Sequence, residues 1–266
     1  MGTPKQLYKF LHRRDLHWLL EAETLRVGSA EYYRKEYARR EVKDQTINDP
    51  NEGTLIRPQV GVLGPWSTER EKSFFGLQGR QVSINSVISQ NTFIVRVPDF
   101  HMICFAHAPI EPVVKALCDP TVRELGIEPY DACVAIDDVP GLLGAIIQTG
   151  RLLGEDGREL GHLGKRWGRL ESGYVSYGDL SVPLHETPPV QDGFLKDTSF
   201  RHQQEYRLKL HLNPGQSREY DGQAFTIRVP GLKRFLSPVE LEIRDTHGFL
   251  ERRKGGTYKT STASPP

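Results

Sequence analysis

The sequence has few cysteines, no long apolar run and almost no net charge, and each shortage excludes a class of protein. Its three cysteines, Cys104, Cys118 and Cys133, are widely spaced, which argues against a disulfide framework and for a reducing compartment. The apolar run Leu142–Ile147 is far too short to cross a membrane. Residues Met1–Gln6 lack the apolar stretch of a secretory signal. We therefore expect a cytoplasmic protein without a membrane partner.

The charge of the chain is nearly balanced, with 35 Lys and Arg against 34 Asp and Glu. This balance neither demands nor excludes a nucleic-acid partner, and any basic surface has to be local. A chain of 266 residues is long enough to bury a core without disulfides. Because no internal repeat and no clear linker are found, we expect a single α+β domain over residues 1–253 and a flexible tail over residues 254–266.

Helical patterns gather early in the chain and strand patterns dominate late, which favours α+β over a repeated βαβ arrangement. Two early strands, Leu7–Phe10 and Leu25–Val27, flank a helix predicted over Asp15–Thr24, and Ser29 is expected to cap the next helix. The later strands are predicted over Val82–Ser89, Thr92–Val97, Met102–Ala106, Ala132–Ile136, Tyr174–Tyr177, Glu205–Leu212, Ala224–Val229 and Val239–Ile243.

The late strand, read with the residues before it as Arg201–Leu212, carries the most functional information. Side chains alternate between the faces of a strand, so one face is apolar and is expected to enter the core. The other face carries the polar residues Gln203, Glu205, Arg207, Lys209 and His211. One interpretation is a solvent-exposed row of ion pairs, which contribute little to stability. The other interpretation is a row of functional groups.

The functional interpretation comes from a resemblance. Gln203-x-Glu205 is similar to the motif that NAD-dependent ADP-ribosyltransferases carry near the end of their domain. The resemblance implies that Glu205 holds the ribose 2′-hydroxyl and supports the oxocarbenium-like transition state as nicotinamide leaves. It implies that Gln203 orients the acceptor or a water molecule. The physical requirement is a carboxylate beside developing positive charge, as in glycoside cleavage.

The start of the chain adds to this resemblance. In ADP-ribosyltransferase folds the first strand ends in Tyr-Arg or Tyr-His, and Tyr8-Lys9 occupies the corresponding place. The resemblance implies that Lys9 anchors the cofactor as a point charge for phosphate and that Tyr33 stacks on nicotinamide. Ser29 and Arg207 complete the implied cofactor-binding set, with Arg207 as a partner of a nearby carboxylate. The alternatives are that Lys9 is a surface residue and that Tyr33 packs on the core.

The order of several short motifs resembles that of an uncharacterised bacterial family whose activity is unassigned. These motifs are Tyr8-Lys9-Phe10, Asn48-Asp49-Pro50-x-Glu52, Cys104-Phe105-Ala106, Asp131–Asp137, Phe194-Leu195-Lys196 and Glu205-Tyr206-Arg207. A Met-Trp followed by a Tyr, expected after the Cys-Phe segment, is missing. Together the two resemblances imply a split β-sandwich with flanking helices that binds NAD. It would hydrolyse NAD or transfer ADP-ribose to a protein or nucleic-acid acceptor, as a toxin or a phage-defence effector.

The Asn-Asp-Pro loop is expected to contact the substrate through Asn48, Asp49 and Glu52. Its structural alternative is an Asx-turn that leaves Glu52 at an exposed corner.

Two other functions remain open. Restriction-type nucleases use an acid and a Glu-x-Lys strand to hold magnesium, and Glu205 with Arg207 is similar if Asp179 or Asp197 supplies the acid. Arginine in the lysine place does not readily share a proton, which disfavours this function. The remaining alternative is a non-catalytic regulatory protein of a toxin–antitoxin or defence pair, whose polar strand face is an interface.

No metal site is expected. His101-x-x-Cys104-x-x-His107 has spacing of a zinc-binding kind, but on a strand the two histidines face away from the cysteine. The basic stretch around Trp167 is interpreted as a solvated loop whose tryptophan is held in the core.

Overall fold

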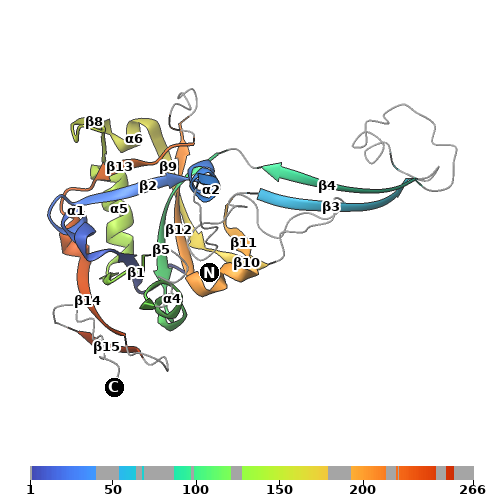
Figure 1. The fold of residues 1–266 in the computed structure, drawn as a ribbon. Helices are drawn as coiled ribbons and strands as arrows, with labels where there is room; N and C mark the ends of the chain where they lie inside the picture. The colour runs from blue at the N-terminus through green and yellow to red at the C-terminus, as the bar shows by residue number, and fades with distance from the viewer. Residues whose placement is uncertain are drawn as a thin grey trace, which may run out of the picture.

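The computed structural model describes residues 2–39, 54–63, 68, 87–96, 99–120, 128–178, 193–213, 220, 222–243 and 250–254. Within them, eleven strands form one antiparallel main sheet that a few helices cover, so the α+β class is confirmed (Figure 1). The strands of the main sheet are β1 Leu7–Leu11, β2 Thr24–Ser29, β5 His101–His107, β6 Ala132–Ile136, β7 Arg151–Leu153, β8 Glu159–His162, β9 Trp167–Tyr174, β12 Glu205–Leu212, β13 Phe225–Arg228, β14 Leu236–Ile243 and β15 Leu250–Lys254.

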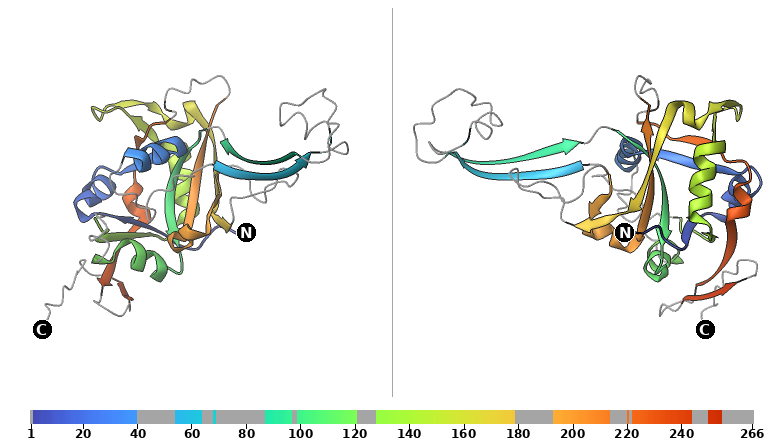
Figure 2. Two further views of the ribbon diagram at one scale, coloured as in Figure 1. Left: turned by 45° about the vertical axis from the view of Figure 1, so that its right-hand side comes forward. Right: turned by 180° about the vertical axis from the view of Figure 1, so that it is seen from behind.

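The remaining elements are shorter or lie outside this sheet. The helices are α1 Leu16–Leu20, α2 Ala30–Arg39, α4 Glu111–Leu117, α5 Val139–Thr149 and α6 Leu163–Arg166, with 3₁₀ helices η1 Arg13–Asp15, η3 Thr198–Gln203 and η4 Leu232–Phe235. The two-stranded sheets are the antiparallel pair β3 Thr54–Leu63 and β4 Val87–Arg96, and the parallel pair β10 Ser176–Gly178 and β11 Leu195–Asp197. The β3–β4 ribbon extends away from the rest of the molecule (Figure 2).

Strand β5 marks the place where the main sheet divides. One edge of β5 pairs with β12 along most of its length. The other edge pairs with β1 beside Ala106 and with β2 beside Met102. Between these two pairings, the carbonyl oxygen of Cys104 accepts a hydrogen bond from Nζ of Lys9 at 2.9 Å. The two early strands therefore diverge at Cys104, and a lysine side chain satisfies the backbone group exposed there.

Apolar side chains cover both faces of the main sheet. On one face, Leu142 and Ile146 of α5 share a buried core with Leu208 of β12. On the opposite face, α4 and the start of α2 cover two smaller apolar clusters. Helix α5 begins where the sequence provides a cap, because the Asp138 carboxylate accepts a hydrogen bond from the Gly141 amide at 2.9 Å.

Most predicted elements are confirmed, but the first helix is wrong in extent. It ends at Leu20 instead of Thr24, and Thr24 already begins β2. Glu23 takes a left-handed conformation with φ 55°, which turns the chain between the two elements. The Glu23 carboxylate also accepts a hydrogen bond from the Gly231 amide at 3.0 Å, a contact 208 residues away that local patterns do not reveal.

Three further differences concern strands. The structure has one continuous strand, β4, where two were predicted over Val82–Ser89 and Thr92–Val97, because Gln90 and Asn91 continue the pairing with β3. The strand predicted over Tyr174–Tyr177 is instead divided between β9 and β10. The basic stretch around Trp167 forms α6 and β9, so the loop prediction is wrong, although the tryptophan is indeed buried.

The tail was predicted to begin at Lys254, but that residue is the last of β15 and pairs with Val239. Residues 255–266 lie outside the described residues. Among the described residues, no helix combines the length and the apolar character needed to span a membrane.

Candidate active site

A cavity of about 160 Å³ lies on the face of the main sheet that carries α2 and α4. Lining residues come from β1, β5 and α4 and are largely apolar, and α2 contributes Tyr33. Lys9 from β1 also lines the cavity, and Lys196, Gln203 and Glu205 give it a polar end. The cavity thus brings together Tyr8, Lys9, Tyr33, Gln203 and Glu205, which the sequence assigned to one site from positions almost 200 residues apart.

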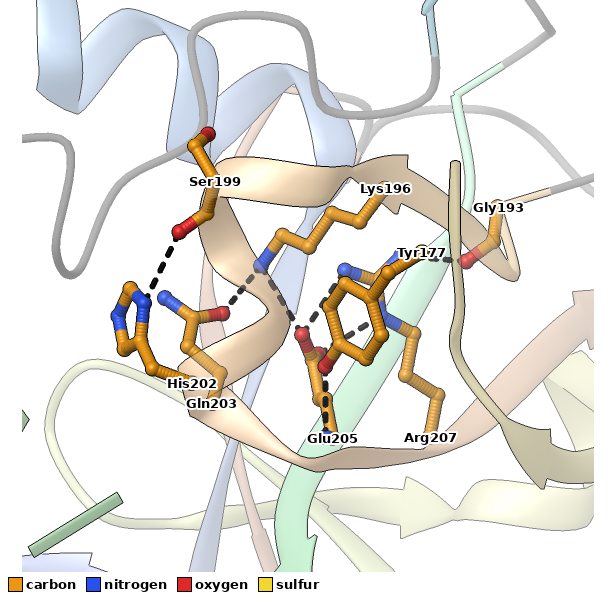
Figure 3. A network of polar contacts seen from close by, with 8 residues as sticks. All are labelled: Tyr177, Gly193, Lys196, Ser199, His202, Gln203, Glu205 and Arg207. Atoms are coloured by element: carbon orange, nitrogen blue, oxygen red, sulfur yellow. Dashed lines mark hydrogen bonds and ion pairs between the residues drawn. The ribbon is translucent and has the colours of Figure 1, made fainter. Parts of the chain in front are cut away.

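The polar end is an ordered network around the Glu205 carboxylate (Figure 3). Nε of Arg207 donates to Oε1 at 2.7 Å, and Nη2 of the same side chain donates to Oε2 at 3.2 Å. Nζ of Lys196 donates to Oε2 at 2.9 Å and to Oε1 of Gln203 at 2.7 Å. Arg207 also donates to the carbonyl oxygen of Gly193. Every link is charge-assisted, so the carboxylate is held in one orientation.

The network is buried, so the solvent-exposed interpretation is wrong for Glu205, Arg207 and Lys209, whereas His211 at the far end of the same face is half-exposed and pairs with Glu171 at 2.8 Å. The exposed fractions are 5% for Glu205, 1% for Arg207 and 4% for Lys196, and Lys209 further along β12 is equally buried. The ammonium of Lys209 lies over the ring of Phe100, 4.8 Å from its centroid. Strand β12 therefore has an apolar buried face and a charged buried face.

The charges around Glu205 determine its ionisation. Burial alone would raise the pKa of this carboxyl, but the charges of Arg207 and Lys196, with hydrogen bonds from Arg207 and Cys104, hold the pKa well below its ordinary value. Burial raises the pKa of the Cys104 thiol, which stays protonated. The site therefore presents a permanent carboxylate at neutral pH.

Gln203 and Glu205 reach the network by a route that the strand prediction missed. Gln203 is the last residue of η3, and Gln204 then takes a left-handed conformation with φ 44° before β12 begins. The Asp197 carboxylate caps η3 by accepting a hydrogen bond from the Ser199 amide at 2.8 Å. The strand predicted from Arg201 is wrong in its first part, yet both side chains still meet at the cavity.

Tyr33 and Lys9 each depend on a particular backbone feature. The ring of Tyr33 lies against β2 at Gly28, where an added Cβ would come within 2.7 Å of the ring. Burial raises the pKa of the Tyr33 hydroxyl well above its ordinary value, so it stays neutral. Lys9 is half-buried at the division of the sheet, and burial lowers the pKa of its ammonium. Gly28 and the diverging strands thus place an aromatic ring and a cation at one cavity.

Other predicted residues lie elsewhere. Ser29 is buried outside the cavity lining and caps α2 as expected, accepting a hydrogen bond from the Tyr32 amide at 3.0 Å. Arg207 was also predicted to bind the cofactor, but it is not among the residues that line the cavity; its guanidinium binds the Glu205 carboxylate, as the carboxylate partner that was predicted. The proposed substrate loop with Asn48, Asp49 and Glu52 falls outside the described residues.

The residues considered as ligands for zinc or magnesium lie in different parts of the fold. His101 packs against Trp167 and Phe225 on the face of β5 opposite Cys104, as the alternation predicted. Asp197, a candidate acid for a nuclease, caps η3 instead, and Asp179 lies outside the described residues. Across the parts of the chain that the structure describes, no three His, Cys, Asp or Glu side chains form a group able to hold a metal ion.

Sequence reasoning missed Lys196 and Tyr177 as members of this site. Lys196 lies in a three-residue strand, and Tyr177 lies in the strand paired with it. The hydroxyl of Tyr177 accepts a hydrogen bond from the Glu205 amide at 2.8 Å. The only available signal was the position of Lys196 in one of the motifs of the uncharacterised family.

Comparisons of this chain with protein-family models, with curated proteins and with solved structures give no match. The function therefore has to be inferred from the chemistry of the cavity.

Proposed function

We propose that this chain is an ADP-ribosyltransferase-like protein that binds NAD in the cavity and breaks the bond between nicotinamide and ribose. The observation that carries the proposal is the convergence of an aromatic ring, a cation, an amide and a permanent carboxylate on one cavity. These are Tyr33, Lys9, Gln203 and Glu205. The divergence of β1 and β2 beside β5 supports the split β-sandwich that the proposal requires.

The size and lining of the cavity favour a single aromatic ring as its occupant. A cavity of about 150 Å³ lined by apolar side chains binds benzene in an engineered protein, and the volume here is about 160 Å³ with largely apolar walls. Nicotinamide has a six-membered ring and a polar carboxamide, which matches an apolar cavity with one polar end. The ribose and phosphates would extend outward from it, with Lys9 as a point charge for phosphate.

The proposed reaction needs no group beyond those at the site and an acceptor. The bond between C1′ of the ribose and the ring nitrogen breaks, and its electron pair goes to the nitrogen, so nicotinamide leaves as a neutral molecule. The ribose becomes an oxocarbenium ion beside the Glu205 carboxylate, whose negative charge stabilises it. Water or an acceptor hydroxyl, oriented by Gln203, forms the new bond to C1′ and loses its proton to the solvent.

The nuclease alternative has less support from this geometry. A magnesium ion is held by several oxygen ligands, whereas Glu205 is the one carboxylate among the residues that line the described cavity and is already paired with two cations. Magnesium would have to displace Lys196 or Arg207 from a buried site.

The test is the release of nicotinamide from NAD by the purified protein, with transfer of labelled ADP-ribose followed in a cell extract. Glu205→Gln should lower the release rate by at least about 100-fold, since it removes the charge that stabilises the transition state. Gly28→Ala should weaken NAD binding, because the new Cβ displaces the Tyr33 ring. Gly144→Ala is its control, since a Cβ there meets nothing within 4 Å.

The matched control for Glu205 is Glu159→Gln, which changes a surface carboxylate that also lies between two cations. It should release nicotinamide at the wild-type rate. Wild-type protein that neither binds NAD nor releases nicotinamide would refute the proposal. NAD binding without release would indicate a binding protein, and magnesium-dependent nicking of DNA or RNA would indicate the nuclease.

A further inference from the structure

The Lys196 ammonium binds two other residues of the site, one in the 3₁₀ helix that follows β11 and one in β12. Lys196 lies in the middle of β11, buried to 4% exposure. Its Nζ reaches Oε1 of Gln203 at 2.7 Å and Oε2 of Glu205 at 2.9 Å, and it lies 5.0 Å from the centroid of the Phe200 ring. One cation thus joins the two side chains that carry the proposed chemistry (Figure 3).

We propose that Lys196 is the positioning residue of this site, whose single ammonium holds the Glu205 carboxylate and the Gln203 side-chain amide in their working orientations. This inference rests on the proposed function, because only that function defines the orientation in which the two groups react. The contacts of Lys196 with Glu205 and Gln203 do not depend on it. The amide of Gln203 has one acceptor oxygen and one donor nitrogen on opposite sides. Since the ammonium takes the oxygen, the amide nitrogen is turned away from Lys196.

Arg207 does not duplicate this role. It lies on the same strand as Glu205 and holds the carboxylate while it also donates to the carbonyl oxygen of Gly193. Lys196 is the contact through which the β10–β11 pair orients Gln203 as well as Glu205. Tyr177 of β10 supports the same junction, because its hydroxyl accepts the hydrogen bond from the Glu205 amide. The active orientation therefore depends on how β10 and β11 pack against β12.

Removal of Lys196 should leave a protein that folds. Without it, Glu205 still forms a one-to-one pair with Arg207, so no buried carboxylate loses all its partners. The ionisable groups that face or influence the Glu205 carboxylate come from five other elements or from its own strand. They are Arg207 on β12, Lys196 on β11, Tyr177 on β10, Cys104 on β5, Lys9 on β1 and Tyr33 on α2. Only Lys196 changes in the test, and the others remain in place.

The test compares wild-type protein with Lys196→Met and Lys196→Arg by two independent measurements. The first is a ¹³C NMR titration of the Glu205 carboxyl carbon, assigned with Glu205→Gln. Loss of the Lys196 charge should raise the Glu205 pKa in Lys196→Met, and Lys196→Arg should restore it towards the wild-type value. The second is the steady-state kinetics of nicotinamide release.

In the kinetic measurement, Lys196→Met should lower kcat about 100-fold, the effect of a misplaced reacting group, while KM for NAD stays within about threefold. Lys196→Arg should recover part of kcat. A Glu205 titration that does not change in Lys196→Met would overturn the inference, as would a change confined to KM. If the wild-type protein releases no nicotinamide, the proposed function fails, and the titration alone then decides the role of Lys196.

Discussion

Two carboxylates of this chain each lie between two cationic side chains, and they differ above all in exposure. Glu205 contacts a lysine at 2.9 Å and an arginine at 2.7 Å, and all three side chains are buried. Glu159 lies 3.4 Å from Arg228 and 4.0 Å from Arg151, in an open surface cleft with 45% of its side chain exposed. The same residue types give a fixed group in one place and a solvated one in the other. Burial, more than composition, makes Glu205 a candidate for chemistry.

The largest expected difference between the two carboxylates is in stability. Glu205→Gln leaves two buried cations without their counter-charge, so it should lower the free energy of unfolding by about 4 kcal/mol. Glu159→Gln breaks only exposed pairs and should cost about 0.5 kcal/mol. Urea unfolding of both variants at pH 7 measures the two values. Equal costs for the two substitutions would contradict the comparison.

The difference in stability between the wild type and Glu205→Gln should also depend on pH. The folded-state pKa of Glu205 is depressed, so its stabilising contribution is present above the ordinary carboxyl pKa of about 4.3 and is lost as the pH falls through the folded value. The gap between wild type and Glu205→Gln should therefore narrow as the pH drops below about 4. A gap that stays constant down to about pH 2 would mean that charge is not its cause.

The parity of β12 could be predicted from the sequence, but its burial could not. The alternation of Tyr206, Leu208 and Leu210 with charged residues is that of a strand with one face in the core and one in solvent. In the structure the charged face is covered as well, by segments that lie before β12 in the sequence. The alternation of residues along a strand predicts which side chains share a face, but it does not predict which other segments pack on that face.

Several members of the site could be predicted, but Tyr177 and Lys196, which belong to strands of three residues, were missed. Lys9 lies in the middle of a strand and Tyr33 in a helix that the sequence predicts, and both line the cavity. Lys196 lies in a strand of three residues that is too short to produce a periodic signal, and its pairing with β10 is parallel and non-local. Gln203 lines the cavity as predicted, but it ends η3 and does not lie on the strand whose alternation was used to orient it, because Gln204 takes a left-handed conformation before β12 begins.

A smaller effect is expected from the removal of single hydroxyl groups on the two faces of β12. Tyr177→Phe removes the acceptor of the Glu205 amide on the charged face and should cost about 2 kcal/mol, because that amide is then left unsatisfied. Tyr206→Phe, on the apolar face, removes a hydrogen bond to the Ser172 hydroxyl and should cost about 1 kcal/mol. Thermal unfolding of both variants measures the difference. A larger loss of stability in Tyr206→Phe than in Tyr177→Phe would contradict this prediction.

The smallest expected effect is that of salt, and it separates the two carboxylates by mechanism. At about 1 M salt the Debye length falls to about 3 Å, which screens exposed charges but acts much less on buried ones. The cost of Glu159→Gln should therefore fall towards zero between low salt and 1 M NaCl, a change of about 0.5 kcal/mol. The cost of Glu205→Gln should stay constant, since Glu205 and its two cationic partners are buried. Unfolding curves of the wild type and both variants at the two salt concentrations provide the measurement.

A salt-dependent cost at Glu205 would mean that the network opens to water in solution, and the cavity would then lack the low-dielectric environment that the proposed reaction requires.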